Sequence, residues 1–553
     1  MFYKKISTIY YRIVFKIMFN FCKIMFKFIK VFDKHSEYLA EKGNFDLPNV
    51  SFCIDDKDVH YNPFDFSKQY LTFVGTERPT TFKFSGSGIS YSLDEGKTWV
   101  ALASNTDSPS IGDGEKIMWK GEMTPNGEAG IGTFSATVSG DIENGTFNIE
   151  GNVMSLLYGD NFADKVDLSG KEYAFSKLFQ SNERIISAKN MKLLATTLAW
   201  NCYQGMFNGC INLTTAPELP STTLAAWCYG NMFQDCTLLT TAPELPATTL
   251  AEYCYQDMFS GCTSLTTAPE LPATTLAEYC YQDMFRDCTS LRTAPSLPAT
   301  TLATNCYQGM FSGCTSLVNA PQLPATTLAS ECYRSMFNGC INLTTAPELP
   351  STTLAAWCYG NMFQDCTLLT TAPELPATTL ADSCYAFMFS RCSNLTTAPE
   401  LPATTLATNC YQGTFRDCTS LRTAPSLPSK TLVDSCYYGM FRGCTNLTTA
   451  PELPATTLVL SCYGNMFQDC TALTTAPELP ATTLASYCYG YMFRGCTSLN
   501  YIKAMFTTTP STTYTNSWVD GVAASGTFVK NSAAQWNVSG VNGIPTGWTV
   551  QTA

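Results

Sequence analysis

Apolar residues recur in closely spaced pairs through most of the second half of the chain. In one representative unit these positions are Leu224, Ala225, Cys228, Tyr229, Met232, Phe233 and Cys236. Steps of one and three residues alternate, which places the side chains along one face of a helix. Thr222 or Thr223 precedes the run, and its hydroxyl can cap the first turn. The pattern therefore predicts a short amphipathic helix in each unit.

A short β-prone segment follows each predicted helix. Leu239-Thr240-Thr241-Ala242 leads into Pro243, and Pro246 ends the next apolar segment. Each unit is therefore expected to be a short helix, a turn and a short strand. One such unit cannot bury its apolar face alone, so neighbouring units must stack into a continuous core. The expected fold of residues 193–500 is an α/β solenoid.

Cysteines mark the period of these units. They occur every 26 residues from Cys202 to Cys488, and a second series follows eight residues later, from Cys210 to Cys496. Neither series contains an insertion, so there are twelve repeats, which hold 24 of the 26 cysteines. Residues 206–251 recur unchanged at 336–381, five repeats later. Such identity at a fixed period indicates recent tandem duplication.

The repeated cysteines are predicted to be buried free thiols. If the segment is helical, the two cysteines of a unit lie about 12 Å apart, beyond the roughly 7 Å Cα limit of a disulfide. Equivalent cysteines of neighbouring units would lie on helices packed roughly 8–10 Å apart, again too far. Zinc ligands are usually two to four residues apart or include histidines, and the repeats have neither feature. We therefore expect no metal site and no cofactor.

Variation between the repeats is concentrated in the residues that separate the apolar pairs, and these are expected to face solvent. The position just before the first cysteine is often aromatic. We take the aromatic residues at this position as candidate binding residues: Trp227, Tyr253, Tyr279, Trp357 and Tyr487. Flat aromatic side chains are suited to anchoring a protein or a sugar. The alternative is that each ring only packs against the neighbouring repeat.

Residues 68–170 alternate between apolar and polar residues in short runs separated by Gly- and Asp-rich turns, which predicts a small β-sandwich. Within this region, residues 92–99 resemble the Asp-box of sialidases and other propellers. The residues that carry this resemblance are Ser92, Asp94, Gly96 and Trp99. In such a box the Asp and Ser bond the turn backbone and the Trp packs beneath it. A propeller needs several boxes, so this one is expected to be a structural hairpin turn.

The repeat array has atypical ends. Residues 171–192 are expected to form a degenerate capping repeat, because they contain no cysteine and carry charges at Glu183, Arg184 and Lys189. Residues 501–553 form a β-like tail that is expected to cover the last repeat. Solenoid ends need such polar, atypical caps.

Residues 1–34 differ from the rest of the chain in charge. They hold eight bases and one acid and therefore carry a net charge of +7. Since the whole chain carries −12, the remainder carries −19. On a helical wheel the bases form one stripe, which favours a helix lying on an anionic membrane surface. The alternative is a translation start at Met18 or Met25. No uninterrupted apolar core typical of a signal peptide or a membrane span is present. Residues 35–67 are expected to be a linker.

Charge and histidine content exclude several functions. An acidic body is unsuited to nucleic acid, because that affinity depends largely on Lys and Arg neutralising phosphates. His35 and His60 are the only histidines and both precede the repeats. The repeats therefore lack the imidazole on which most hydrolase triads and zinc sites depend. We expect the protein not to be an enzyme.

The repeat also carries a family resemblance. The pattern Met-Phe-x-x-Cys-Thr-x-Leu-Thr-Thr-Ala-Pro-x-Leu-Pro, as in residues 258–272, resembles the BspA-like branch of leucine-rich-repeat surface proteins. The resemblance covers about residues 193–500. It implies an α/β solenoid and a surface or secreted protein associated with adhesion, of a kind found in gut and oral bacteria, their phages and some protists. The second cysteine and the regular Ala-Thr-Thr depart from the family pattern, so no particular ligand is implied.

Together these observations predict a non-enzymatic binding or adhesion protein, displayed on a cell surface, extracellular or part of a phage virion. It would recognise a protein or glycan on a cell surface through the solenoid, and residues 1–34 would contact a membrane surface. One alternative is an intracellular or virion-associated repeat scaffold. The other is a glycan-active enzyme, which would require paired carboxylates in a cleft around the Asp-box.

Overall fold

The computed structural model describes residues 50–55, 58–63, 65–137 and 145–553. The chain divides into two units at Lys68. In the first unit, strands β1 (Val50–Asp55) and β2 (Asp58–Pro63) form an antiparallel hairpin, and the 3₁₀ helix η1 (Phe66–Lys68) follows. The segment predicted as a linker, residues 35–67, therefore contains a hairpin. The helix predicted over residues 1–34 lies outside the described residues.

The second unit, Gln69–Ala553, begins with a six-stranded mixed sheet in the order β10-β9-β3-β7-β5-β6 and a two-stranded sheet, β4-β8. The strands are β3 (Leu71–Gly75), β4 (Thr81–Phe84), β5 (Ile89–Ser92), β6 (Val100–Leu102), β7 (Lys116–Gly121), β8 (Phe134–Thr137), β9 (Phe147–Asn152) and β10 (Ile185–Lys192). The short helices are η2 (Gly127–Ala129), α3 (Ser155–Tyr158) and η3 (Gly159–Asn161).

Phenylalanine rings fill the space between the two sheets. Phe73 of β3 lies 5.0 Å from Phe82 of β4 and 4.9 Å from Phe134 of β8, measured between ring centroids. The alternation of buried and exposed residues in β4 and β7 gives each strand one apolar face toward this core. Strand β10 pairs in parallel with β9. The larger sheet therefore continues past residue 170, the predicted end of the sandwich, into the predicted capping repeat.

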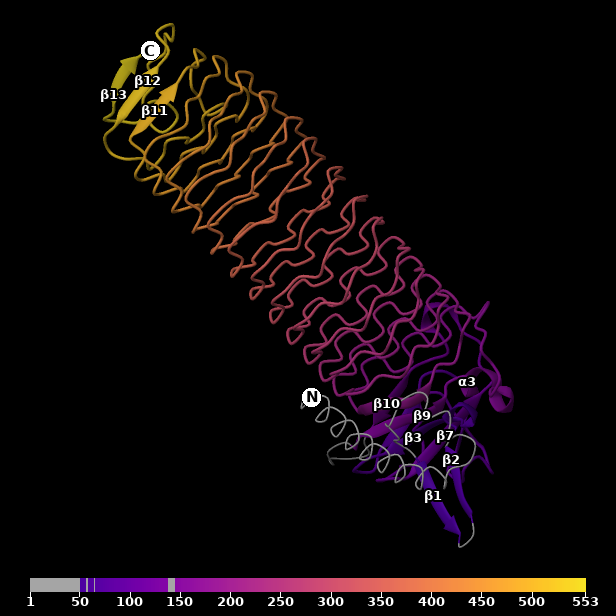
Figure 1. Cartoon of the computed structure of the whole chain (residues 1–553). Coiled ribbons are helices and arrows are strands. Elements are labelled where there is room, and N and C mark those ends of the chain that lie inside the picture. The colour runs from indigo at the N-terminus through magenta and orange to yellow at the C-terminus, as the bar shows by residue number, and fades with distance from the viewer. Residues whose placement is uncertain (1–49, 56–57, 64, 138–144) are drawn as a thin grey trace, which may run out of the picture. The chain divides into compact units, whose positions relative to one another are not determined.

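The helix predicted in each repeat is wrong. Between β10 and β11 the chain forms successive coils without an α-helix, and Figure 1 shows these coils lying one beside the next. We number them from coil 1, which contains Cys202, to coil 12, which contains Cys488. Each coil passes through a series of tight turns where the helix was expected. The predicted cap by Thr222 or Thr223 has no helix to act on.

Backbone hydrogen bonds in these turns alternate between two directions. The amides of Cys228 and Met232 donate to carbonyls three residues earlier, at distances of 3.2 Å in both cases. The amide of Tyr229, between them, donates instead to the carbonyl of Cys254 in the next coil, at 3.1 Å. Half of the donors thus close turns and half join coils. In a helix every amide would donate to a carbonyl of its own coil and none to the next coil. The hydrogen bonds between coils therefore favour the turns over a helix.

Every fourth residue of the turn segment has a positive φ. In coil 2 these residues are Trp227 (59°), Asn231 (55°) and Asp235 (59°). The apolar pairs repeat every four residues, as such turns require, whereas a helix of 3.6 residues per turn would rotate them off one face. A positive φ is unfavourable for most side chains and favours Gly, Asn and Asp. This explains why the variable positions are rich in these three residue types.

The interior consists of ladders of identical side chains. Tyr229 stacks on Tyr255 at 6.0 Å and Phe233 on Phe259 at 5.6 Å, and all four rings are buried. The 24 cysteines of the twelve coils are free and buried, as predicted. The prediction assumed that neighbouring units lie roughly 8–10 Å apart, as packed helices do. That assumption was wrong, because equivalent rings of neighbouring coils stack at 5.6 and 6.0 Å. Each thiol of the second series donates to a backbone carbonyl, as Cys236 Sγ does to Phe207 O at 3.1 Å.

The opposite side of each coil is extended but forms no named strand. Adjacent coils are joined there by isolated parallel bridges between threonines, such as Thr241 with Thr267. Strands β11 (Tyr501–Ala504), β12 (Thr527–Lys530) and β13 (Thr549–Thr552) then form a parallel sheet. The amide of Phe493 donates to Trp518 O at 2.8 Å, as amides do between coils. The tail beyond residue 500 thus begins with a further coil.

Candidate binding surface

The residue before the first cysteine occupies the same backbone position in all twelve coils. Its φ lies between 51° and 59° throughout. We call this series of residues, one per coil, the first outer row. The candidate aromatic residues all belong to it: Trp227, Tyr253, Tyr279, Trp357 and Tyr487.

Three of these five residues lie together. Trp227, Tyr253 and Tyr279, in coils 2 to 4, stack face to face with centroid distances of 4.4 and 4.5 Å and interplanar angles of 9° and 6°. All three are partly exposed. Burial, followed by the proximity of Tyr279, Glu252 and Glu278, raises the pKa of the Tyr253 hydroxyl. We call these three rings the aromatic ladder.

The other two candidates are separate. Trp357, in coil 7, is partly exposed and is covered by Arg334 of coil 6, whose guanidinium lies 4.7 Å from the ring centroid. Arg334 is held by Glu331 at 2.7 Å. Tyr487 in coil 12 is 49% exposed. Serine or asparagine occupies the first outer row in the coils between them. The five residues are therefore not one continuous stripe.

Carboxylates line the aromatic ladder in the next row, four residues further along each coil. Asp257 and Asp283 occupy adjacent coils and are half-buried. Burial, followed by the neighbouring Asp283, raises the pKa of Asp257 to about 7, and Arg286 partly opposes this. Burial also raises the pKa of Asp283. Two carboxylates placed side by side in a partly dry site disfavour each other's charge.

Sequence reasoning missed one aromatic residue. Trp200 of coil 1 is 46% exposed and meets Tyr173 edge-on at 5.1 Å. Trp200 stands two residues before its cysteine, so it does not belong to the first outer row, where Asn201 is found. Tyr173 has the φ of that row, 58°, in the segment that precedes coil 1. Tyr173 and the first outer row share this backbone conformation. The sequence does not show it, so only the structure relates Tyr173 to that row.

The Asp-box forms a hydrogen-bonded hairpin turn between β5 and β6. Ser92 Oγ accepts from Gly96 N at 2.9 Å, and Asp94 Oδ1 accepts from Thr98 N at 2.8 Å. The bonds to Thr98 are the main cause of the lowered pKa of Asp94, about 2. Trp99 packs edge-on against Tyr70 at 4.8 Å. Asp94 is thus committed to holding the turn, and its low pKa is unsuited to a general acid.

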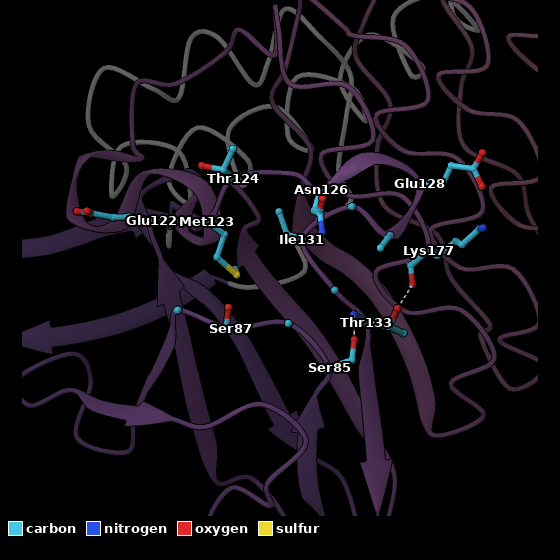
Figure 2. A pocket seen from close by; sticks show the side chains of 15 residues that line it. Ser85, Ser87, Glu122, Met123, Thr124, Asn126, Glu128, Ile131, Thr133 and Lys177 are labelled. Carbon is cyan, nitrogen blue, oxygen red and sulfur yellow. Dashed lines mark hydrogen bonds between the residues drawn. The ribbon is translucent and has the colours of Figure 1, made fainter.

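A pocket of about 730 Å³ lies elsewhere in the sheet region, between the β4–β5 connection and the segment around η2. Figure 2 shows its two acidic residues, Glu122 and Glu128, on opposite sides of the pocket with their carboxylates pointing away from each other. Lys177 also lines it. Glycosidases need two carboxylates that face each other across the substrate. This pocket does not present such a pair.

Two further properties concern the described part of the chain. No group of His, Cys, Asp and Glu side chains there is arranged to hold a metal ion. None of its helices combines the length and apolar character that crossing a bilayer requires.

Comparison with known proteins places these coils in a family. The family model described as the BspA type leucine-rich repeat region matches residues 172–318, 228–370, 280–422, 358–474 and 383–519, which together span more than half of the chain. The chain belongs to the BspA-type leucine-rich-repeat family. Its coils are therefore a leucine-rich-repeat solenoid of the kind used for binding. No curated protein matches the sequence.

One solved structure similar to this BspA-type chain is the "Crystal structure of TLR13-ssRNA13 complex". The likeness covers 65% of this chain and 45% of that chain, at 13% identity and a TM-score of 0.20. This chain thus spans less than half the length of that protein. A likeness at this score carries no argument about ligand or function.

Proposed function

We propose that this BspA-type protein is a non-enzymatic adhesion protein, displayed at a cell or virion surface, that recognises a protein partner through the aromatic ladder. In this proposal residues 68–170 support the solenoid, and the coils carry the surface that binds the partner. Leucine-rich-repeat solenoids present a regular surface on a rigid scaffold, which suits recognition of a large partner.

The observation that carries the proposal is the placement of aromatic residues at a backbone position that disfavours them. A residue other than glycine at positive φ costs on the order of 1–3 kcal/mol. Coils 1, 5 and 9 have asparagine at the same position, which adopts this conformation more readily. The fold therefore does not require a ring in the first outer row. Three consecutive aromatic residues at this position indicate selection for the surface that they form.

The stacking geometry favours a protein over a glycan as the partner. Rings 4.4 and 4.5 Å apart leave no room for a ligand between them, so the ladder presents mainly ring edges to solvent. A glycan chain that stacks on successive rings would need an open face on each of them, and the faces between these three rings are closed. Trp and Tyr side chains are enriched among the central contacts of protein interfaces.

The test compares three full-length proteins: the natural chain, W227S and W357S. Each is panned against a random peptide library and applied to a glycan array. We expect peptides that bind the natural chain and W357S equally and lose at least tenfold in affinity for W227S. W357S is a matched control, because Trp357 lies in an identical block of 46 residues.

Equal peptide binding by W227S would contradict the proposal. Trp227-dependent binding on the glycan array, without peptide binding, would replace the protein partner by a glycan. Near-ultraviolet circular dichroism of each variant establishes that the coils are intact.

A further inference from the structure

The duplicated block places two tryptophans in the same local setting. Trp227 and Trp357 belong to identical segments, 206–251 and 336–381, and have φ values of 59° and 56°. Each indole lies against the glycine three residues later in its coil. A Cβ at Gly230 would lie 3.0 Å from Trp227 Cε3, and one at Gly360 would lie 2.6 Å from Trp357 Cε3. The two rings therefore adopt similar orientations.

What covers the rings differs. Arg334, from the preceding coil, lies over Trp357 and is held there by Glu331. Five repeats earlier the corresponding residues are Gln204 and Asn201, and within the described residues no cation lies over Trp227. Tyr253, from the following coil, takes one face of Trp227. The opposite face, toward coil 1, is therefore the face that Arg334 occupies on Trp357.

The charge around the two tryptophans differs in the same sense. The turn segments of coils 2 to 4 (225–236, 251–262 and 277–288) contain six acids and one base, Arg286. The corresponding segments five repeats later, in coils 7 to 9 (355–366, 381–392 and 407–418), contain three acids and two bases. Trp357 thus has its own cation, Arg334, whereas the turn segments of coils 2 to 4, which include Trp227, carry an excess of acid.

We propose that the coil 1 face of Trp227 binds an arginine side chain of the protein partner, in the way that Trp357 binds Arg334. This inference rests on the proposed function and names the chemistry of the partner: a basic segment with at least one exposed arginine. A guanidinium stacks flat on an indole and keeps its edge donors free for nearby carboxylates. A lysine ammonium is a more strongly hydrated point charge and should bind less well.

The first experiment uses defined peptides and the full-length protein labelled with 5-fluorotryptophan. The peptides contain glycine and serine around one central arginine, lysine or citrulline, where citrulline is a neutral analogue of nearly the same shape. The fluorine signal of Trp227, assigned by its loss in W227F, should shift on titration. We expect arginine to bind about five times more tightly than citrulline, with lysine between them. Equal affinities for arginine and citrulline would overturn the inference.

Two further variants exchange the settings of the two tryptophans. Q204R, alone or with N201E, recreates the coil 6 arrangement. The new arginine should lie over Trp227 and block the peptide, so that the peptide no longer shifts the Trp227 signal. R334Q should expose Trp357, whose signal should then respond to the arginine peptide. Both replacements introduce residues found at these positions in other repeats, so the coils should fold.

The outcomes separate this inference from the proposed function. If W227S loses the peptides selected by panning but Q204R retains them, the aromatic ladder binds a partner and the arginine contact is wrong. If W227S retains those peptides, the proposed function itself fails. Loss with both variants, together with a response of Trp357 in R334Q, supports both.

Discussion

One 46-residue block occurs in two different settings: from coil 1 to the start of coil 3 (residues 206–251) and from coil 6 to the start of coil 8 (residues 336–381). In coils 2 to 4 the tryptophan of the block stacks on Tyr253, whereas in coils 6 to 8 the next coil offers Ser383 and the preceding coil offers Arg334. One region has an aromatic ladder with excess acid, and the other has a tryptophan already paired with a cation. In a solenoid each repeat contacts only its neighbours, so the side chains of the adjacent coils decide which contacts an identical sequence makes at the surface.

The largest expected difference between the regions follows from removing the middle ring of the ladder. Y253S deletes two stacking contacts, at 4.4 and 4.5 Å. Each is worth about 0.5–1.5 kcal/mol, so local opening of coils 2 to 4 should become easier by about 2 kcal/mol. Hydrogen exchange of the inter-coil amides measures this quantity. S383A, at the corresponding position of coil 8, should leave exchange unchanged, and an equal effect of both variants would remove the distinction.

A smaller difference should appear with pH. Asp257 has a pKa of about 7 in the folded protein, above the usual value of an aspartate. Between about pH 4 and pH 7 the native state therefore binds more protons than the unfolded state, so the stability of coils 2 to 4 falls as pH rises. The groups acting on Asp257 are Asp283 and Asp235, which raise its pKa, and Arg286, which lowers it.

We expect a loss on the order of 1 kcal/mol between pH 5 and pH 8, allowing for solvent screening. Protection factors, corrected for intrinsic exchange, test this expectation. D257N should flatten the dependence. Coils 6 and 7, which have Ser335 and Asn361 in this row, should show none. A pH dependence that persists in D257N would assign the effect to another group.

The smallest effect is expected from an ion pair that only the second region has. Arg391 of coil 8 bonds both oxygens of Asp365, at 2.5 and 2.6 Å, whereas Asp235 of coil 2 faces Gly261. R391G makes the two regions alike at this position. Exposed pairs contribute up to about 1 kcal/mol, and glycine relieves the positive φ of 61° at residue 391. The free energy of opening of coils 7 and 8 should change by less than about 0.5 kcal/mol, measured by hydrogen exchange. A larger loss would show that this pair is a main support of these coils.

Part of the candidate surface could be read from the sequence. The aromatic residues before the first cysteine stand out because the other coils have Asn, Ser or, in coil 6, Glu at this position. The ladder itself could not be predicted, because whether Trp227 meets Tyr253 face to face depends on the offset between coils. The role of Arg334 was missed for the same reason, since its contact with Trp357 crosses from one coil to the next.

By itself the sequence determined the 26-residue period, the apolar residues of the core and the burial of the thiols, because each depends only on which residues recur and how apolar they are. The tertiary structure alone decided that the turn segment is not helical. A spacing of four residues is close enough to the 3.6 of a helix to be mistaken for it. Hydrogen bonds from Tyr229 to Cys254 and their equivalents, which join residues of different coils, select the turns. No local pattern records a bond to the neighbouring coil.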